Sequence, residues 1–195
     1  MIDKKLNFLS LIIMYNEPHR HYHNLSHIAR MYDSAKEYKI ELSDEQSLAI
    51  LFHDVYYETD KKKLIFNGKY ISNEELSADM ACCWCEYNHY GQEFARKVYQ
   101  IVRDTEKHIP NIPESNDVLD LDLLGLAFPE TYKIQGDKIR LEYSHFTDDE
   151  FNKGRAEWLK SMLEKEFIFT GFFANGDYEV NARENLLEDL KECER

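Results

Sequence analysis

Histidine and aspartate residues occur in parts of this chain where the neighbouring residues are strongly apolar. His53 and Asp54 follow the run from Leu48 to Phe52, which predicts a helix buried on most of its surface. An ionised aspartate is costly in such surroundings unless a partner neutralises it. A divalent cation is a suitable partner, because carboxylate oxygens and neutral imidazole nitrogens are both common metal ligands. The His-Asp pair therefore indicates a metal site.

Two further side chains complete a set of four ligands. His27 starts an apolar row at the spacing of one helix face, which we expect to face inward. Asp122 lies in Leu-Asp-Leu-Asp-Leu-Leu, where a carboxylate is again embedded in an apolar helix. We predict that these two residues converge with His53 and Asp54 on one divalent ion. The sequence leaves its identity open among Mn, Mg, Co, Ni, Fe and Zn.

Each of these residues also has a simpler interpretation. A His-Asp pair arises by chance in many sequences, so one pair alone does not define a site. Asp120 and Asp122 would be solvated if their helix were only marginally stable. The hypothesis of a metal site therefore rests on the combination of residues.

Local signals predict the helices that position these residues. Capping-box patterns, in which Ser or Thr precedes Gln or Glu by three residues, begin at Ser43, Ser72 and Thr147. Asn24 precedes another helix, and Pro129 suits the first turn of a further one. The apolar residues that mark the helices are Leu6, Leu9, Ile12 and Ile13; Leu25, Ile28, Tyr32 and Ala35; Leu48, Ile50, Leu51, Phe52 and Val55; Leu76, Met80 and Trp84; Phe94, Val98, Ile101 and Val102; Val118, Leu121 and Leu124; Phe151, Trp158, Leu159 and Met162; and Val180, Leu186, Leu187 and Leu190.

The helical pattern predicts an all-α fold, a single-domain helical bundle spanning residues 1–195. With 7 Gly and 4 Pro, the chain has few residues for the turns of an all-β fold. The longest irregular segments are 58–71 and 167–177, and each is long enough for a short hairpin. Asn67-Gly68 is a turn signal in the first of them.

Charge restricts the expected partners. The formal net charge of −13 argues against binding to nucleic acid or anionic lipid, which needs clustered Lys and Arg. A small phosphorylated molecule remains compatible, because a metal and a few Arg residues reverse the field locally. The apolar run from Leu9 to Met14 is too short to span a bilayer, and we expect no signal peptide. A homo-oligomer is also compatible with the sequence.

The cysteines favour a reducing compartment. Three of the 4 Cys are Cys82, Cys83 and Cys85, which does not resemble a secreted disulfide framework, so we expect a cytoplasmic protein. Cys82 and Cys85 have C-x-x-C spacing, but no second such pair occurs. We therefore interpret them as packing residues rather than as a zinc or redox site.

The order of these motifs resembles the HD-domain superfamily of metal-dependent phosphohydrolases. Arg-His-Tyr-His-Asn-Leu-Ser-His-Ile at 20–28 and Phe-His-Asp-Val-Tyr-Tyr at 52–57 are similar to a bacterial branch of predicted HD phosphohydrolases. The similarity continues through segments 73–78, 105–108, 121–125, 139–143, 154–155, 168–170 and 182–185. Each motif is short, but their order and spacing cover nearly the whole chain.

The resemblance implies a helical bundle that binds one divalent metal through His27, His53, Asp54 and Asp122. It also implies hydrolysis of a small phosphoester, for example a nucleotide, by metal-activated water, with Asp54 in a catalytic role. Many HD hydrolases carry a Glu three residues after the motif Asp, whereas this chain has Tyr57 there.

Other residues are candidates for the remaining catalytic roles. Glu74 is the candidate for general acid or base, and His108 is a second catalytic candidate. Arg20 and His23 are the expected phosphate-binding residues, since no Gly-rich phosphate loop is present. For Arg140 and Arg155, we favour structural salt bridges.

Two alternatives to the hydrolase remain. His89 and His108 lie between Asp54 and Asp122 in the chain, an order also seen in HD proteins with two metals, some of which are di-iron oxygenases. The missing Glu at Tyr57 is compatible with a regulatory protein that binds metal or nucleotide without turnover.

Overall fold

The chain folds into helices whose boundaries follow the local signals. The computed structural model describes residues 8–174 and 176–195, so Leu6 of the first predicted apolar stripe lies outside the described residues. The α-helices are α1 (Phe8–Tyr15), α2 (Leu25–Tyr38), α3 (Asp44–Phe52), α4 (Asn73–Tyr87), α5 (Gln92–Asp104), α6 (Ser115–Leu123), α7 (Pro129–Glu142), α8 (Asp148–Leu163) and α9 (Asp177–Cys193). Short 3-10 helices are η1 (Lys61–Leu64) and η2 (Leu124–Ala127).

Side-chain caps explain several of the helix starts. Ser43 and Thr147 each form a complete capping box, with Gln46 and Glu150 respectively. Asn24 accepts a hydrogen bond from the backbone of Ser26, at the start of α2. Such caps satisfy amide groups that the first helical turn leaves without partners. The all-α prediction is confirmed.

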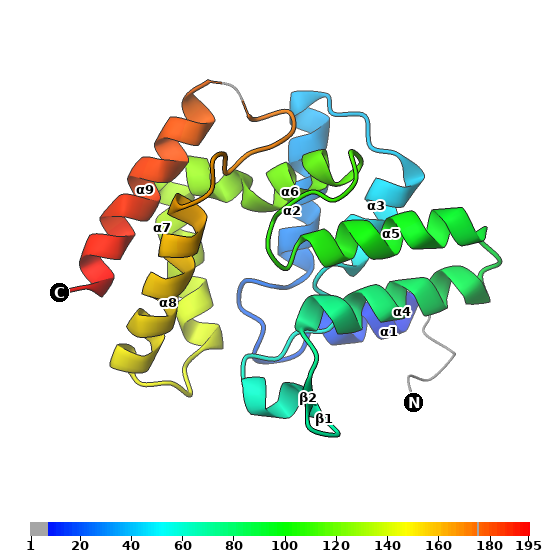
Figure 1. Cartoon of the computed structure of the whole chain (residues 1–195), viewed down its shortest axis with the longest axis horizontal. Helices are drawn as coiled ribbons and strands as arrows, with labels where there is room; N and C mark the ends of the chain where they lie inside the picture. The colour runs from blue at the N-terminus through cyan, green and yellow to red at the C-terminus, as the bar shows by residue number, and fades with distance from the viewer. Residues whose placement is uncertain (1–7, 175) are drawn as a thin grey trace.

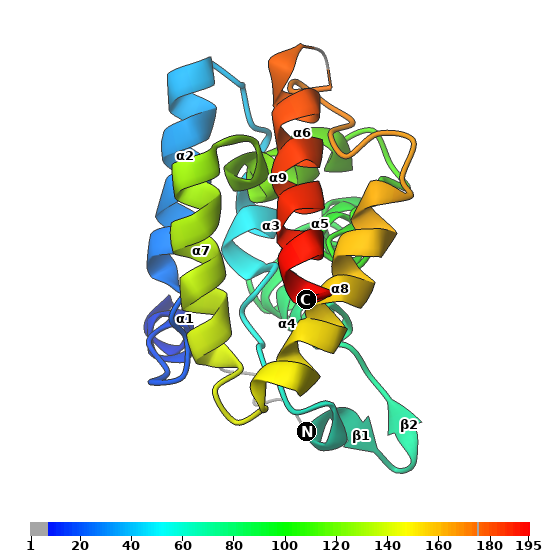
Figure 2. The same cartoon turned by 90° about the vertical axis from the view of Figure 1, so that its left-hand side faces the viewer.

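The one sheet in the described ranges is a two-stranded hairpin, β1 (Ile65–Phe66) and β2 (Lys69–Tyr70). Asn67 and Gly68 form its turn with φ of 52° and 79°, the conformation that favours these two residue types. It projects from the helices (Figures 1 and 2). The hairpin expected within 58–71 is thus confirmed, whereas the described residues of 167–177 contain no strand.

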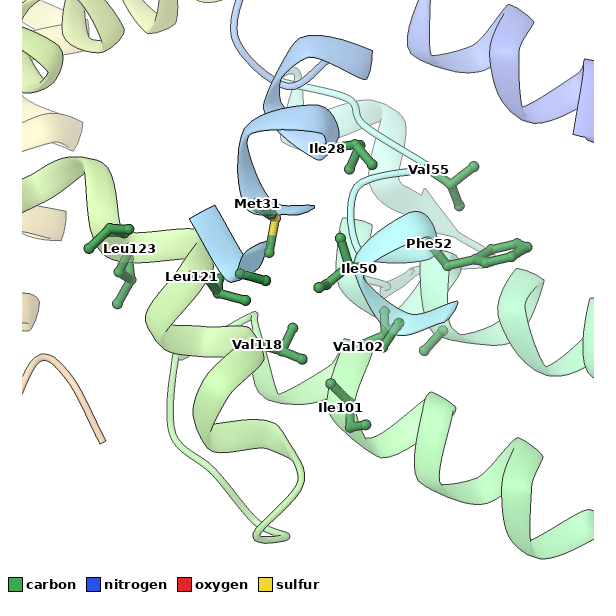
Figure 3. Close-up of a cluster of buried hydrophobic side chains, with 14 of the residues drawn as sticks. Ile28, Met31, Ile50, Phe52, Val55, Ile101, Val102, Val118, Leu121 and Leu123 are labelled. Atoms are coloured by element: carbon green, nitrogen blue, oxygen red, sulfur yellow. The ribbon is translucent and has the colours of Figure 1, made fainter. Parts of the chain in front are cut away.

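The part of the core that positions the site lies between α2, α3, α5 and α6, and the same cluster of buried residues continues to α4, α8 and α9. Figure 3 shows Met31, Ile50, Val102 and Val118 from these four helices pointing toward one another, and all are buried. Helices α7, α8 and α9 run beside each other on one side of this part of the core (Figure 2). In the described ranges, no helix has the length and apolar character that crossing a membrane requires.

Candidate metal centre

The core helices bring two histidines to one point. His27 lies on the inward row of α2 with Met31 and Ala35, and it is 2% exposed. His53 is the residue that ends α3, and it is also 2% exposed. Their Nε2 atoms lie 3.2 Å apart. Helix packing alone therefore places two imidazoles from separate helices in contact.

Two carboxylates face this pair of histidines. Asp54 Oδ2 lies 3.0 Å from His53 Nε2 and 3.8 Å from His27 Nε2. Asp122 on α6 approaches from another direction, with Oδ1 at 2.9 Å from His27 Nε2 and 3.7 Å from His53 Nε2. One ligand atom each from His27, His53 and Asp54 lie within 4.8 Å of one another. The structure therefore brings the four predicted ligands together.

These spacings agree with the geometry of a first coordination shell. Ligands at about 2.1 Å from one ion lie roughly 3.0 to 3.4 Å apart when they are neighbours in octahedral or tetrahedral arrangements. The distances from His53 Nε2 to Asp54 and to His27 Nε2, 3.0 and 3.2 Å, fall in this range. The distances from His27 Nε2 to Asp54 and from His53 Nε2 to Asp122, 3.8 and 3.7 Å, are longer.

The hydrogen bond of His53 shows why a cation suits this point. Its Nδ1 lies 2.9 Å from the carbonyl oxygen of Ile50, which only accepts, so Nδ1 carries the proton. In the neutral ring Nε2 is then a lone pair, directed at His27 and Asp54. The buried Oδ2 atom of Asp54 has no hydrogen-bond partner among the described residues. Lone pairs converge here, and either a proton or a metal relieves their repulsion.

The pKa values express the same electrostatics for the metal-free protein. Burial lowers the pKa of His53, but Asp54 and Asp122 outweigh it and raise the value to about 10. Burial acts to raise the pKa of both carboxyls, but His53 holds each of them below its ordinary value. His27 differs, because burial dominates and its pKa is lowered. Without metal, a proton on His53 therefore serves as the cation of the cluster.

His108 lies beside the cluster rather than within it. Its Nε2 is 3.0 Å from Oδ2 of Asp122, the oxygen that does not face His27. A histidine on the outer oxygen of a ligand carboxylate orients that carboxylate. The sequence predicted a catalytic role for His108, and the geometry gives it a position next to a candidate ligand.

Arg20 has a different environment from the one expected of a phosphate-binding residue. Its side chain is buried and donates to the carbonyl oxygens of Asp54 at 2.6 Å and Val55 at 2.9 Å. It also donates to Glu17 at 2.9 Å and to the carbonyl of His23 at 3.4 Å. Four of the five guanidinium donors are thus used by protein acceptors. We revise its role to that of a residue that holds the backbone after α3 in place.

His23 is paired with a buried glutamate that the sequence analysis did not single out. Its Nδ1 lies 2.6 Å from Oε2 of Glu142 on α7, which is 2% exposed. The Oε1 atom accepts from the backbone amides of Tyr22 at 2.7 Å and His23 at 2.9 Å. Tyr57 donates to Oε2 at 3.0 Å and stacks on the His23 ring with 4.2 Å between centroids. Tyr57 therefore helps fix His23.

The charges of this pair support each other. Burial lowers the pKa of His23, but Asp54 and then Glu142 raise it above its ordinary value. Burial raises the pKa of Glu142, but its hydrogen bond with His23 brings it below the ordinary value. His23 lies beside the cluster, with 6.3 Å between its ring centroid and that of His27. Since Nδ1 faces Glu142, Nε2 is the nitrogen that remains for a ligand.

Glu74 lies in the first turn of α4, close enough to the cluster for electrostatic interaction with Asp54. Burial is the main cause that raises its pKa, and the negative charge of Asp54 adds to the effect. A carboxyl group with a raised pKa keeps its proton to higher pH, as a general acid requires. The position is compatible with the predicted role.

The remaining charged residues of interest have structural partners. Asp120 is buried and accepts from the backbone amides of Thr170, Gly171 and Phe173, so it secures the segment after α8. Arg140 pairs with Asp148, and Arg155 with Asp189. His89 is exposed in the turn between α4 and α5. Cys82 and Cys85 are free thiols on α4.

Comparison with known proteins adds nothing to this geometry. No family model matches the chain, and neither a curated protein nor a solved structure is significantly similar to it.

Proposed function

We propose that this protein is a metal-dependent phosphohydrolase that acts on a small phosphoester, such as a nucleotide. The observation that supports the proposal is the convergence of two buried histidines, His27 and His53, with the partly buried Asp54 and Asp122 at spacings that suit one divalent ion. Two neutral imidazoles and two carboxylates balance a divalent charge. When bound, such an ion supplies Lewis acidity toward a phosphoryl oxygen and lowers the pKa of a coordinated water.

The protein groups around the ligands have distinct roles in this proposal. His23 is the candidate proton donor to the leaving oxygen, because Asp54 and Glu142 raise its pKa and Glu142 fixes its orientation. In its protonated form the imidazole also suits a phosphate oxygen. Glu74 is the second candidate for acid or base, through its raised pKa. In this proposal Arg20 orders the backbone at Asp54, to whose carbonyl oxygen it donates.

The alternative functions receive less support from the geometry. A di-iron site of the kind considered above would use His89, but this residue is exposed in the turn between α4 and α5 and is not part of the cluster of His27, His53 and Asp54. Among the described residues, one cluster of at least three closely spaced potential ligands occurs. A regulatory protein that binds metal without turnover would share the four ligands, and only an activity measurement separates it from a hydrolase.

The test is a screen of purified protein with Mn²⁺, Mg²⁺, Co²⁺, Ni²⁺, Fe²⁺ and Zn²⁺ against nucleotides and a generic aryl phosphate. We expect hydrolysis that chelator abolishes and that Asp122→Asn reduces. Asp137→Asn, which changes an exposed aspartate on α7, is the matched control and should leave the rate unchanged. Absence of turnover with every metal, combined with measurable metal binding, would favour the regulatory protein instead.

A further inference from the structure

His108 has a backbone conformation that is uncommon for residues other than glycine. It lies between α5 and α6 with φ of 49°, in the left-handed region that side chains with a Cβ atom disfavour. Such a residue persists where surrounding contacts over-determine the conformation. In this conformation the imidazole of His108 contacts Asp122. The contacts that hold this backbone therefore bear on the candidate metal centre.

Asp104 holds the later part of the same loop. This buried carboxylate accepts from the backbone amide and the side-chain amide of Asn111, each at 2.7 Å, and from Ser115 Oγ at 2.6 Å. These contacts order the residues that lead into α6. None of them reaches His108, so they do not account for its conformation.

Lys165 contacts the backbone on both sides of the His108 Cα atom. Its Nζ donates to the carbonyl oxygen of Lys107 at 2.5 Å and to that of His108 at 3.2 Å. The Lys107 carbonyl belongs to the peptide group that φ of His108 rotates, and the His108 carbonyl to the group that ψ rotates. One ammonium group bonded to both oxygens fixes their relative orientation. It thereby restricts both dihedral angles of His108.

Lys165 is itself held in place from α9. The guanidinium of Arg183 donates to the carbonyl of Lys165 at 2.8 Å and to that of Leu163, at the end of α8, at 3.0 Å. Arg183 is fixed in turn by its 2.7 Å ion pair with Glu179. The lysine therefore extends from an ordered segment, and its position does not depend on the loop that it contacts.

We propose that Lys165 is a positioning residue of the candidate metal centre, which acts by holding His108 in the orientation that places Nε2 on Asp122. The inference rests on the proposed metal site, because its functional effect is on the carboxylate that faces the metal. The Lys165 ammonium holds the backbone carbonyl groups of Lys107 and His108. The backbone of His108 in turn orients its imidazole, which contacts Asp122.

The experiment compares Mn²⁺ affinity, measured by isothermal titration calorimetry, of the full-length wild type and variants. We expect Lys165→Met to weaken Mn²⁺ binding by about tenfold, the lower end of the effect of removing an outer-shell partner. Lys160→Met is the matched control, since Lys160 is in the last turn of α8, shortly before Lys165 in the chain, and pairs with the exposed Glu194. It should bind Mn²⁺ as the wild type does. Lys165→Gln replaces Lys165→Met if the latter does not fold.

A double-mutant cycle separates positioning from a general structural role. In a His108→Ala background, Lys165→Met should cause no further loss of Mn²⁺ affinity, because the residue through which it acts is already absent. Additive losses in the double variant, or wild-type affinity in Lys165→Met, would overturn the inference.

NMR of the imidazole nitrogens in metal-free protein tests the positioning of His108 separately from the proposed function, because it does not depend on metal binding. The Nε2 signal of His108 should change in Lys165→Met and stay unchanged in Lys160→Met, whether or not the protein binds metal. If the wild type binds no Mn²⁺ or other divalent ion, the proposed function fails, and the Nε2 signal still decides whether Lys165 positions His108. An unchanged signal in Lys165→Met refutes that positioning.

Discussion

The imidazole of His23 and the carboxylate of Glu142 lie 2.6 Å apart, although 119 residues separate them in the chain. Glu142 accepts from three groups of the segment before α2, so it fixes both the backbone and the ring at His23. This contact joins α7 to the region of the four candidate ligands. It gives His23 a defined orientation and helps raise the pKa of its ring.

The pairing predicts a pH window for stability. The raised pKa of His23 means that its contribution is complete below about pH 6.5, the unfolded value, and is lost as pH rises through the folded value. The lowered pKa of Glu142 means that its contribution is present above about pH 4.5 and is lost as pH falls. In metal-free protein, the difference in Tm between wild type and Glu142→Gln should therefore be largest between these pH values. A difference in Tm between the two proteins that is constant with pH would contradict the proposed pairing of His23 and Glu142.

For activity, His23→Gln should lower kcat by roughly 100-fold or more, the usual contribution of a positioned acid. The exposed His21 provides the control, and His21→Gln should leave kcat unchanged. If the two variants show equal rates with the best substrate of the screen, His23 is not the proton donor.

Metal affinity should rise with pH. In metal-free protein His53 carries a proton, because Asp54 and Asp122 raise its pKa to about 10. A metal takes the place of that proton, so binding releases it, and affinity should increase about tenfold per pH unit below that value. Calorimetry in buffers with different ionisation enthalpies counts the protons released. Release of none between about pH 6 and 8 would show that His53 is not a ligand.

Replacement of Asp54 by Asn should affect both activity and stability. Loss of a negative ligand should reduce hydrolysis by orders of magnitude. From the sequence alone, relief of a buried charge would keep or raise the stability of metal-free protein. The ion pair with His53 reverses this expectation, and we predict a loss of roughly 1 to 3 kcal/mol at neutral pH. Chemical denaturation with chelator present measures it, with Asp137→Asn as control.

Arg20→Lys tests the revised role of Arg20. Lysine cannot reach both carbonyls and Glu17 in the same geometry, so we expect a loss of stability of about 1 to 3 kcal/mol. KM should change no more than kcat. A large increase in KM with wild-type stability would instead support contact with substrate phosphate.

The fold was predictable because its signals are local. The capping boxes at Ser43 and Thr147, the hairpin turn at Asn67-Gly68 and the Pro at the start of α7 each depend on residues within one turn of each other. These signals set where helices begin and end. The inward placement of His27 likewise follows from the spacing of one helix face.

The surroundings of the site were not predictable in the same way. Glu142 is the one buried residue of α7, whose other residues are exposed or half-buried, and no apolar pattern around it in the sequence marks it as buried. Arg20 precedes the first ligand, which suggested substrate binding, but its partners at Asp54 and Val55 become visible only when α2 and α3 pack. Long-range partners decide the role of a charged side chain, and one sequence does not reveal them.

The separation of the candidate ligands along the chain has a consequence for folding kinetics. His27 and Asp122 are 95 residues apart, so a short segment of the unfolded chain does not contain the complete set. A metal that binds only this set acts on the native state, with a stabilisation that grows as the logarithm of its concentration. If the ligands meet after the folding transition state, added metal slows unfolding and leaves the refolding rate unchanged. Denaturant dependence of both rates, with and without metal, would then show when α6 docks onto α2.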